Sequence, residues 1–445
     1  MEEINNRIRH LKPVQIIILG FALVIISGTL LLMLPVAKRG AGSAGFADAL
    51  FTAVSSTCVT GLVVQDTATY WSAFGQAVIL LMIQIGGLGV ITVAISIAIV
   101  SGRKIGLLQR NIMQASISAP QISGIVKFTR FILLATFGCE LAGAVVMLPV
   151  FAGMYGIRKG CWYAVFHSVS AFCNAGFDLM GGSGRFSSLT SLSVHPVINV
   201  TIMALIILGG IGFFTWMDVV VHGIHFSRYR MQSKVSITVS VILILIPALF
   251  FYFCEFGNLE TGRRIWYSLF QAVTPRTAGF NTADLTKLGD NGIFLMIILM
   301  LIGGSPASTA GGMKTTTVAV LFASAFSVFQ RKKDAGLFGR RISTDSITNA
   351  GAILLLYAGL FAVCGMCISA IEKLPLLTCL FETASAIGTV GLTLGITPSL
   401  SLVSRTILVI LMYVGRVGGL TLIFAAVSEK GLHKGRLPEE SITVG

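Results

Sequence analysis

The chain has 445 residues, of which 55% are hydrophobic and only 11% are charged, and this composition excludes an ordinary soluble globular protein. Its formal charge of +14 does not indicate nucleic-acid binding, because 19 of the 32 Lys and Arg residues fall in five segments between apolar runs. Basic residues on every second loop are the orientation signal of a multi-pass membrane protein, and they predict cytoplasmic N- and C-termini. The five basic segments are 1–13, 102–130, 221–234, 331–341 and 429–445.

Long and short apolar segments alternate along the chain. Eight are long enough to cross a bilayer, whereas four of about 12 residues are too short and fit re-entrant helices. The first long segment follows Arg7, Arg9 and Lys12 and exceeds the apolar core of a secretory signal, so we expect it to be a membrane helix. The long segments are 14–35, 76–101, 131–153, 194–222, 235–254, 292–330, 350–371 and 405–427; the short ones are 46–57, 160–171, 263–274 and 375–386.

A glycine loop follows each short segment. In each loop two residues precede a Gly and a large apolar residue follows it, at glycine spacings of 115, 103 and 112 residues. A loop rich in Thr, Val and Gly alone would be weak support, but four at similar spacing form a repeat. Such loops line cation filters, where backbone carbonyls replace the hydration shell of the ion. The predicted filter residues are Val59, Thr60 and Gly61; Asn174, Ala175 and Gly176; Thr277, Ala278 and Gly279; and Thr389, Val390 and Gly391.

These segments predict an all-α, multi-pass membrane protein with four repeats of helix, short pore helix, filter loop and helix. An irregular loop at membrane depth must line water or be buried in protein, so four loops on one chain are expected to converge on one central pore. Pore helices that point their C-termini at this pore favour a cation over an anion. The expected repeats are 1–110, 111–228, 229–341 and 342–445.

The second long segment of the third repeat is anomalous, because residues 291–330 are about twice the length of a membrane span. Its interior holds four Gly, one Pro and three hydroxyl residues, which interrupt a helix. It predicts an intramembrane gate loop across the pathway; a packing kink is the alternative. The expected gate residues are Gly303, Gly304, Ser305, Pro306, Ala307, Ser308, Thr309, Ala310, Gly311, Gly312 and Lys314, the last of which either holds the loop shut or reaches the cytoplasmic face.

Arg416 is the most informative single charge. It follows Gly391 by 25 residues, as Gly304 follows Gly279, so repeat equivalence places it beside the gate loop. A charge at mid-membrane is costly and usually marks function. The alternative is a structural bond from Arg416 to Glu382 or another buried acid.

For the remaining polar residues, structural roles such as capping, ion pairing and packing compete with functional ones. Asp66, Asp178 and Asp284 follow filter glycines and either concentrate cations at the outer mouth or cap nearby turns. We expect Glu140 and Asp218 to pair with neighbouring basic residues and assign them no transport role. Cys364 and Cys367 have the spacing of a redox or metal pair, but they lie in an apolar segment and are expected to pack there.

The four repeats, the filter glycines and the broken third-repeat segment resemble the superfamily of Trk, Ktr and plant HKT potassium transporters over essentially the whole chain. More narrowly, the chain resembles KtrB, the membrane subunit of bacterial Ktr uptake systems. This resemblance implies a bacterial cell-membrane homodimer with one pore per subunit and a cytosolic KtrA-type regulatory ring. ATP or ADP is then expected on the partner and no cofactor on this chain. Gly61 resembles the potassium-selective branch, since plant relatives with Ser there tend to favour sodium.

Three functions are compatible with these patterns. A channel-like potassium pore is favoured by parallel repeats and by the scarcity of acids in the pore core. A sodium- or proton-coupled potassium symporter usually has inverted repeats and intramembrane carboxylates. A membrane enzyme with Ser305 or Ser308 as nucleophile and Lys314 as base is disfavoured, because no third group would orient the base.

Overall fold

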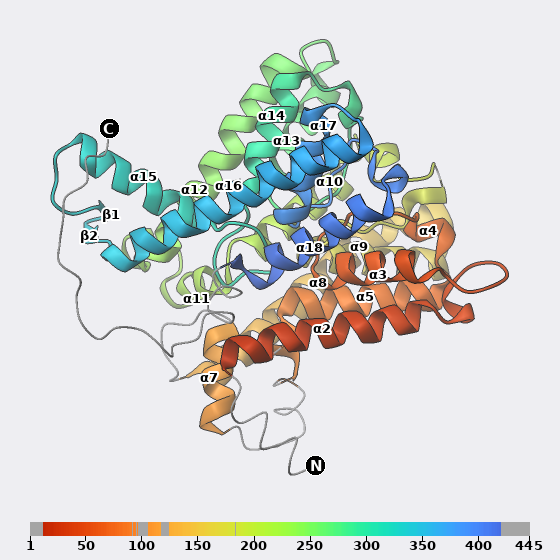
Figure 1. Cartoon of the computed structure of the whole chain (residues 1–445), viewed down its shortest axis with the longest axis horizontal. Helices are drawn as coiled ribbons and strands as arrows, with labels where there is room; N and C mark the ends of the chain where they lie inside the picture. The colour runs from red at the N-terminus through yellow and green to blue at the C-terminus, as the bar shows by residue number, and fades with distance from the viewer. Residues whose placement is uncertain are drawn as a thin grey trace.

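The computed structural model describes residues 12–90, 92–94, 96, 106–116, 124–182 and 184–419, and among these it is all-helical apart from one short hairpin (Figure 1). The predicted fold class is therefore confirmed. The helices of the first half are α2 (Pro13–Leu32), α3 (Phe46–Thr57), α4 (Thr67–Tyr70), α5 (Ala73–Leu88), α7 (Leu107–Ser116), α8 (Ile125–Tyr155), α9 (Ile157–Phe172), α10 (Pro196–Gly210) and α11 (Phe213–His222).

The second half of the chain again alternates long helices with short ones, and an irregular stretch, residues 302–314, separates α14 from α15. Its elements are α12 (Met231–Phe250), which continues as the π-helical turn η5 (Phe251–Glu255), then α13 (Thr261–Val273), α14 (Asp290–Leu301), α15 (Thr315–Phe329), the strands β1 (Gly336–Leu337) and β2 (Arg340–Arg341), α16 (Thr344–Glu372), α17 (Leu376–Ile387) and α18 (Leu402–Val417). Short 3-10 turns are η1 (Pro35–Ala37), η2 (Met180–Gly182), η3 (Thr190–Leu192), η4 (Phe226–Arg228), η6 (Leu285–Lys287) and η7 (Thr397–Ser399).

The first helix of each repeat is long and apolar enough to cross a membrane. In the described part of the chain these helices are α2, α8, α16 and α12 with its η5 extension. α2 is typical, because Ile17, Phe21 and Ile25 are buried at helical spacing while Leu23 and Leu30 on its other side are 66% and 62% exposed. A helix that is apolar all round belongs in lipid, with one side packed on protein.

The second helices are broken, and here the expectation of continuous segments over 76–101, 194–222 and 405–427 was wrong. α5 ends at Gly89, α10 is bent 95° from α11 next to Gly212, and α18 ends at Gly418. These three glycines have φ of +86°, +92° and +92°, a left-handed conformation that glycine adopts without strain. The far ends of the first and last segments extend beyond the described residues, as do most of the basic termini.

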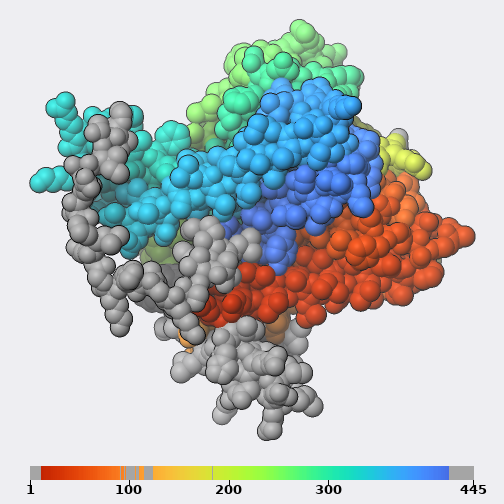
Figure 2. Space-filling model, viewed as in Figure 1, coloured from red at the N-terminus to blue at the C-terminus, as the bar shows by residue number. Residues whose placement is uncertain are grey.

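The four repeats close into a ring. The second helix of each repeat packs against the short pore helix of the next: α5 on α9, α10 on α13, α14 on α17, and α18 on α3. Figure 2 shows the result at the surface, where the red N-terminal and blue C-terminal repeats lie side by side. This closure brings the four glycine loops to one centre. The repeat boundaries stay a prediction, and the first of them falls within α7, which packs on both α2 and α8.

Candidate ion pathway

The four glycine loops share one backbone conformation. Each filter glycine has a positive φ: +92° at Gly61, +69° at Gly176, +79° at Gly279 and +94° at Gly391. The residue two places earlier is also left-handed in every loop, which is uncommon for non-glycine residues and indicates a functional constraint. Those residues are Val59 (φ 57°), Asn174 (58°), Thr277 (65°) and Thr389 (52°).

The loops touch one another in cyclic order. A Cβ added to any filter glycine would collide with the carbonyl oxygen of the residue before the next glycine. The carbonyl oxygens of the four residues before the glycines therefore lie where neighbouring loops meet around one ring. The contacts would be 2.5 Å from Gly61 to Ala175 O, 2.7 Å from Gly176 to Ala278 O, 2.2 Å from Gly279 to Val390 O and 2.2 Å from Gly391 to Thr60 O. We call these four glycines the glycine ring.

A hydroxyl near the end of each pore helix supports its loop, and the sequence analysis missed these residues. Ser55 and Ser385 accept from the amides of Gly61 and Gly391 at 3.1 and 3.0 Å. In the other two repeats the hydroxyl donates to the carbonyl after the glycine. Ser170 Oγ donates to Phe177 O at 2.7 Å, and Thr274 Oγ1 to Phe280 O at 2.6 Å. A Ser or Thr five or six residues before each filter glycine was the available signal.

The predicted gate residues form an irregular loop between α14 and α15, next to the start of the fourth glycine loop. The base of the loop is closed by a hydrogen bond from Gly303 N to Met313 O (2.7 Å). Gly311 packs so closely on the fourth filter loop that an added Cβ would lie 2.0 Å from Thr389 Oγ1. Residues 303–314 are called the gate loop below.

The break between α10 and α11 holds one side of the gate loop. Ser305 N donates to Gly210 O at 2.9 Å, and Phe213 N donates to Ala307 O at 2.7 Å. Thr309 Oγ1 also donates to Phe172 O, at the end of the second pore helix, at 2.9 Å. The bent second helix of repeat 2 therefore supplies free backbone groups that a continuous helix would use internally.

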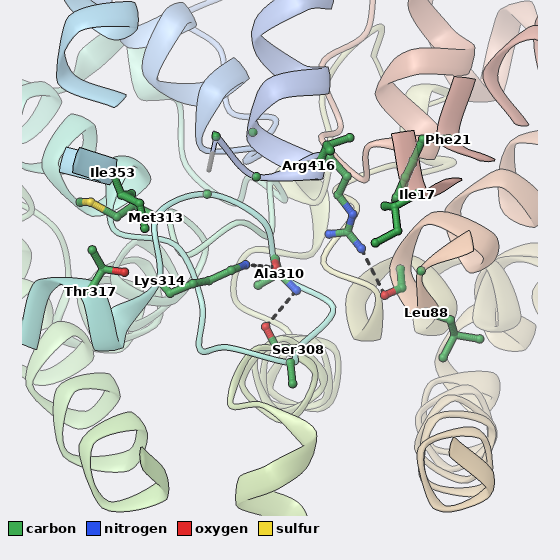
Figure 3. A pocket seen from close by; sticks show the side chains of 18 of the residues that line it. Ile17, Phe21, Leu88, Ser308, Ala310, Met313, Lys314, Thr317, Ile353 and Arg416 are labelled. Atoms are coloured by element: carbon green, nitrogen blue, oxygen red, sulfur yellow. Dashed lines mark hydrogen bonds between the residues drawn. The ribbon is translucent and has the colours of Figure 1, made fainter. Parts of the chain in front are cut away.

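Two basic side chains, Lys314 and Arg416, bind the other side of the gate loop. Lys314 Nζ donates to Ala310 O and Gly311 O at 2.7 and 3.2 Å, so its side chain folds back onto the loop rather than reaching outward. Arg416 donates to Thr309 O at 2.5 Å, to Gly87 O at 3.1 Å and to Gly86 O. In Figure 3 the side chain of Lys314 reaches Ala310, whereas that of Arg416 points toward the chain beside Leu88; both residues help to line a cavity of about 310 Å³. Arg416 thus joins the gate loop to the first repeat.

No buried acid pairs with Arg416 among the described residues. Glu382, the candidate partner, instead accepts hydrogen bonds from Thr393 Oγ1, Leu394 N and Thr397 Oγ1 and so braces the fourth filter loop. The alternative that Arg416 forms a structural bond with Glu382 is therefore wrong, because Glu382 binds other groups.

The remaining acids have other partners. Asp218 pairs with Arg230 at 3.5 Å, as expected. The same expectation was wrong for Glu140, which has polar but uncharged neighbours: Gln84 Nε2 donates to it at 3.2 Å and Cys173 Sγ at 3.7 Å. Gln84 lies on α5 and Cys173 directly follows α9, so no spacing along α8 predicts these neighbours.

The three aspartates that follow glycine loops act as caps. Asp66 accepts from Thr69 N at 2.8 Å, Asp178 from Met180 N at 2.8 Å and Asp284 from Thr286 N at 3.2 Å. Hydrogen bonds from Thr286, with smaller help from Lys287, lower the pKa of Asp284 below its usual value. These contacts are those of the turn-capping alternative. A part in cation attraction stays a prediction.

Arg276, three residues before Gly279, was not singled out from the sequence. Its side chain is buried, and in the described structure its Nη2 donates to Ser240 Oγ at 2.9 Å while its Nε has no partner. The third filter loop thus has a positive charge behind it, which distinguishes it from the other three loops.

Comparison with known proteins agrees with this architecture. The family model described as TrkH, cation transport protein, matches residues 2–434. The chain belongs to this family of cation transport proteins. It is therefore a multi-pass membrane transporter subunit and not an enzyme.

Among the relatives of this TrkH-family chain, the Ktr system potassium uptake protein B of Bacillus subtilis is 38% identical, with 93% of this chain and 92% of the relative covered. The potassium/sodium uptake protein NtpJ of Enterococcus hirae is 36% identical over the full length of both chains. The crystal structure of the potassium transporter TrkH from Vibrio parahaemolyticus has a TM-score of 0.74 at 20% identity, and the match covers 93% of this chain and 84% of the other; it shares the fold.

Proposed function

We propose that this chain is the potassium-translocating subunit of a Ktr-type uptake system. The glycine ring is the observation that carries the proposal, because four backbone carbonyls from four repeats converge where a cation would shed water. The filter residues named above coordinate potassium, and the gate loop with Lys314 and Arg416 controls access from the inner side. Relatives named as potassium uptake proteins support the choice of ion.

The same proposal includes the assembly. A homodimer with one pore per subunit lies in the bacterial cell membrane with cytoplasmic termini, and a KtrA-type ring on that side binds ATP or ADP. The support is the similarity to proteins named as parts of Ktr systems.

Sodium-coupled symport is the second candidate. It is favoured by the relative named as a potassium/sodium uptake protein. Passive flux and coupled uptake differ in whether a sodium gradient drives potassium uphill.

Rubidium uptake into vesicles containing the purified protein separates the two candidates. The vesicles are loaded with potassium and diluted into sodium-free medium with tracer rubidium. We expect uptake down the resulting potential without sodium, and no uptake in protein-free vesicles. Uptake that appears only with an inward sodium gradient, and that continues against the rubidium gradient, would establish symport instead.

A further inference from the structure

The four hydroxyls near the ends of the pore helices hold their glycine loops in two different ways. In repeats 1 and 4 the hydroxyl oxygen accepts from the amide of the filter glycine, at 3.1 and 3.0 Å. In repeats 2 and 3 the hydroxyl donates to the carbonyl of the residue after the glycine, at 2.7 and 2.6 Å. All four residues are buried: Ser55, Ser170, Thr274 and Ser385.

The two modes divide the glycine ring into halves, because the repeats that share a mode are neighbours in the ring. Gly391 of repeat 4 lies against the carbonyl of Thr60 in repeat 1, and Gly176 of repeat 2 lies against that of Ala278 in repeat 3. The difference therefore separates one side of the ring from the other.

The hydrogen bond in repeat 1 fixes the direction of a carbonyl in the ring. The N–H of Gly61 and the C=O of Thr60 belong to one planar trans peptide group, in which they point in opposite directions. The N–H is turned toward Ser55 on α3, so the C=O is turned away from that helix. Its oxygen lies at Gly391 of the neighbouring loop. In repeat 4 the matching bond orients the carbonyl that precedes Gly391 in the same way.

The backbone strengthens the hold in repeats 1 and 4. Thr60 N donates to Ser55 O, and Val390 N donates to Ser385 O, both at 2.8 Å. Each serine therefore binds two consecutive amides of its loop, one through its carbonyl and one through its hydroxyl.

The corresponding carbonyls of repeats 2 and 3 are held less firmly. Gly279 N is 3.4 Å from Thr274 O, which also accepts from Ala278 N at 3.0 Å. Gly176 N has no hydrogen-bond partner within the described part of the chain. The hydroxyls of these two repeats bind further along the loop, so they fix the turn after the glycine rather than the carbonyl before it.

We propose that Ser55 and Ser385 are positioning residues that determine ion specificity, so that repeats 1 and 4 carry most of the discrimination of potassium over sodium. The inference rests on the proposed function, in which the carbonyls of Thr60 and Val390 coordinate the ion. A carbonyl with a fixed direction keeps its distance from the ion and does not close in on the smaller sodium ion. The less restrained carbonyls of repeats 2 and 3 adjust to either ion.

Removal of each hydroxyl tests this division, with the variants Ser55→Ala, Ser170→Ala, Thr274→Val and Ser385→Ala. The melting temperature of the purified full-length protein is titrated with potassium and with sodium, using choline chloride to keep the ionic strength constant. The shifts give the apparent affinity for each ion without a flux measurement. Wild type is expected to bind potassium more tightly than sodium.

All four variants lose one buried hydrogen bond and should show similar losses of melting temperature without potassium or sodium. Ser55→Ala and Ser385→Ala should each lower the potassium-to-sodium affinity ratio by about tenfold, since a lost hydrogen bond no longer orients the carbonyl. Ser170→Ala and Thr274→Val should keep the wild-type ratio. Ser55→Thr and Ser385→Thr retain the acceptor oxygen and should also keep it.

Equal losses of the affinity ratio in all four hydroxyl-free variants would overturn the proposal, and so would a wild-type ratio in both Ser55→Ala and Ser385→Ala. The two serines test it independently, so the comparison holds even if one variant fails to fold. A wild-type protein that binds both ions equally would contradict the proposed function itself. A selective wild type whose Ser55 and Ser385 variants stay selective would contradict only the present inference.

Discussion

At the scale of single residues, the glycine ring explains why each filter position excludes a side chain. Two costs add at Gly61. Its φ of +92° strains any other residue, and a Cβ would lie 2.5 Å from the carbonyl of Ala175 in the next repeat. The second cost falls on a group that we propose coordinates the ion.

Gly61→Ser is therefore expected to reduce discrimination of potassium over sodium, since the displaced Ala175 carbonyl no longer matches one ion. The measurement is the ratio of potassium to sodium uptake in vesicles. Gly395→Ser is a matched control, because Gly395 has a similar φ of +89° with nothing within 4 Å of an added Cβ. Equal selectivity in Gly61→Ser and the parent would show that this loop does not select the ion.

Arg416 is expected to oppose cation flow in two ways. It holds Thr309 of the gate loop against Gly87, and its charge repels an ion in the pathway. At about 6 Å and an effective dielectric of about 20, two unit charges repel by roughly 3 kcal/mol, or about a hundredfold in local occupancy. Arg416→Gln should thus increase rubidium flux and weaken control by the partner ring, with little change in melting temperature.

The control for this variant is Arg405→Gln on the same helix. Arg405 pairs with Asp48 at 3.3 Å, so its loss should lower the melting temperature without increasing flux. An Arg416→Gln protein that is unstable and inactive would show that Arg416 is structural.

At the scale of elements, the pore helices were predictable and the breaks in the second helices were not. The expected segments 46–57 and 375–386 agree within one residue with α3 and α17, because a short apolar run ends at a glycine turn. The sequence does not distinguish the roles of Gly86, Gly87 and Gly89. Gly86 permits close packing on Thr57, whereas Gly89 turns the chain, and only the tertiary structure separates these uses.

The hydrogen-bond partners of the gate loop could not be predicted from the sequence either. Arg416 could be placed beside the loop from repeat spacing. Its bonds to Gly86 and Gly87, however, depend on how α5 ends. The hydrogen bonds that Gly210 and Phe213 form with the gate loop depend on the bend after α10. The apolar composition of this segment does not predict that bend.

Deletion of residues 305–312 should leave a folded protein with faster and less regulated flux. The glycine ring does not include the loop, so the potassium-to-sodium ratio should stay unchanged while the rate increases. Melting temperature, uptake ratio and rubidium flux on one preparation provide the measurement. A well-folded deletion variant that transports no faster than its parent would contradict a gating role.

At the scale of the whole molecule, the basic loops that we propose to be cytoplasmic are candidates for contact with the proposed regulatory ring. Arg331, Lys332 and Lys333 are all exposed at the end of α15. Reversing the three charges to Glu is expected to reduce co-purification with the regulatory ring, most clearly at low salt, where exposed charges interact most strongly. Arg263→Glu, an exposed charge at the start of α13, is the control. Unchanged co-purification would leave these residues as orientation signals only.

The cyclic closure of four unequal loops in one chain has a consequence for how such a pore can change over time. A channel assembled from four identical chains carries every substitution four times, so a small error at the centre is multiplied. Here each loop is encoded separately, and one substitution alters a single quadrant while three neighbours keep their shape. Selectivity can then be adjusted in small steps. In this chain the third repeat carries an inserted loop and the fourth carries Arg416, which binds that loop, and neither feature is repeated in the other quadrants.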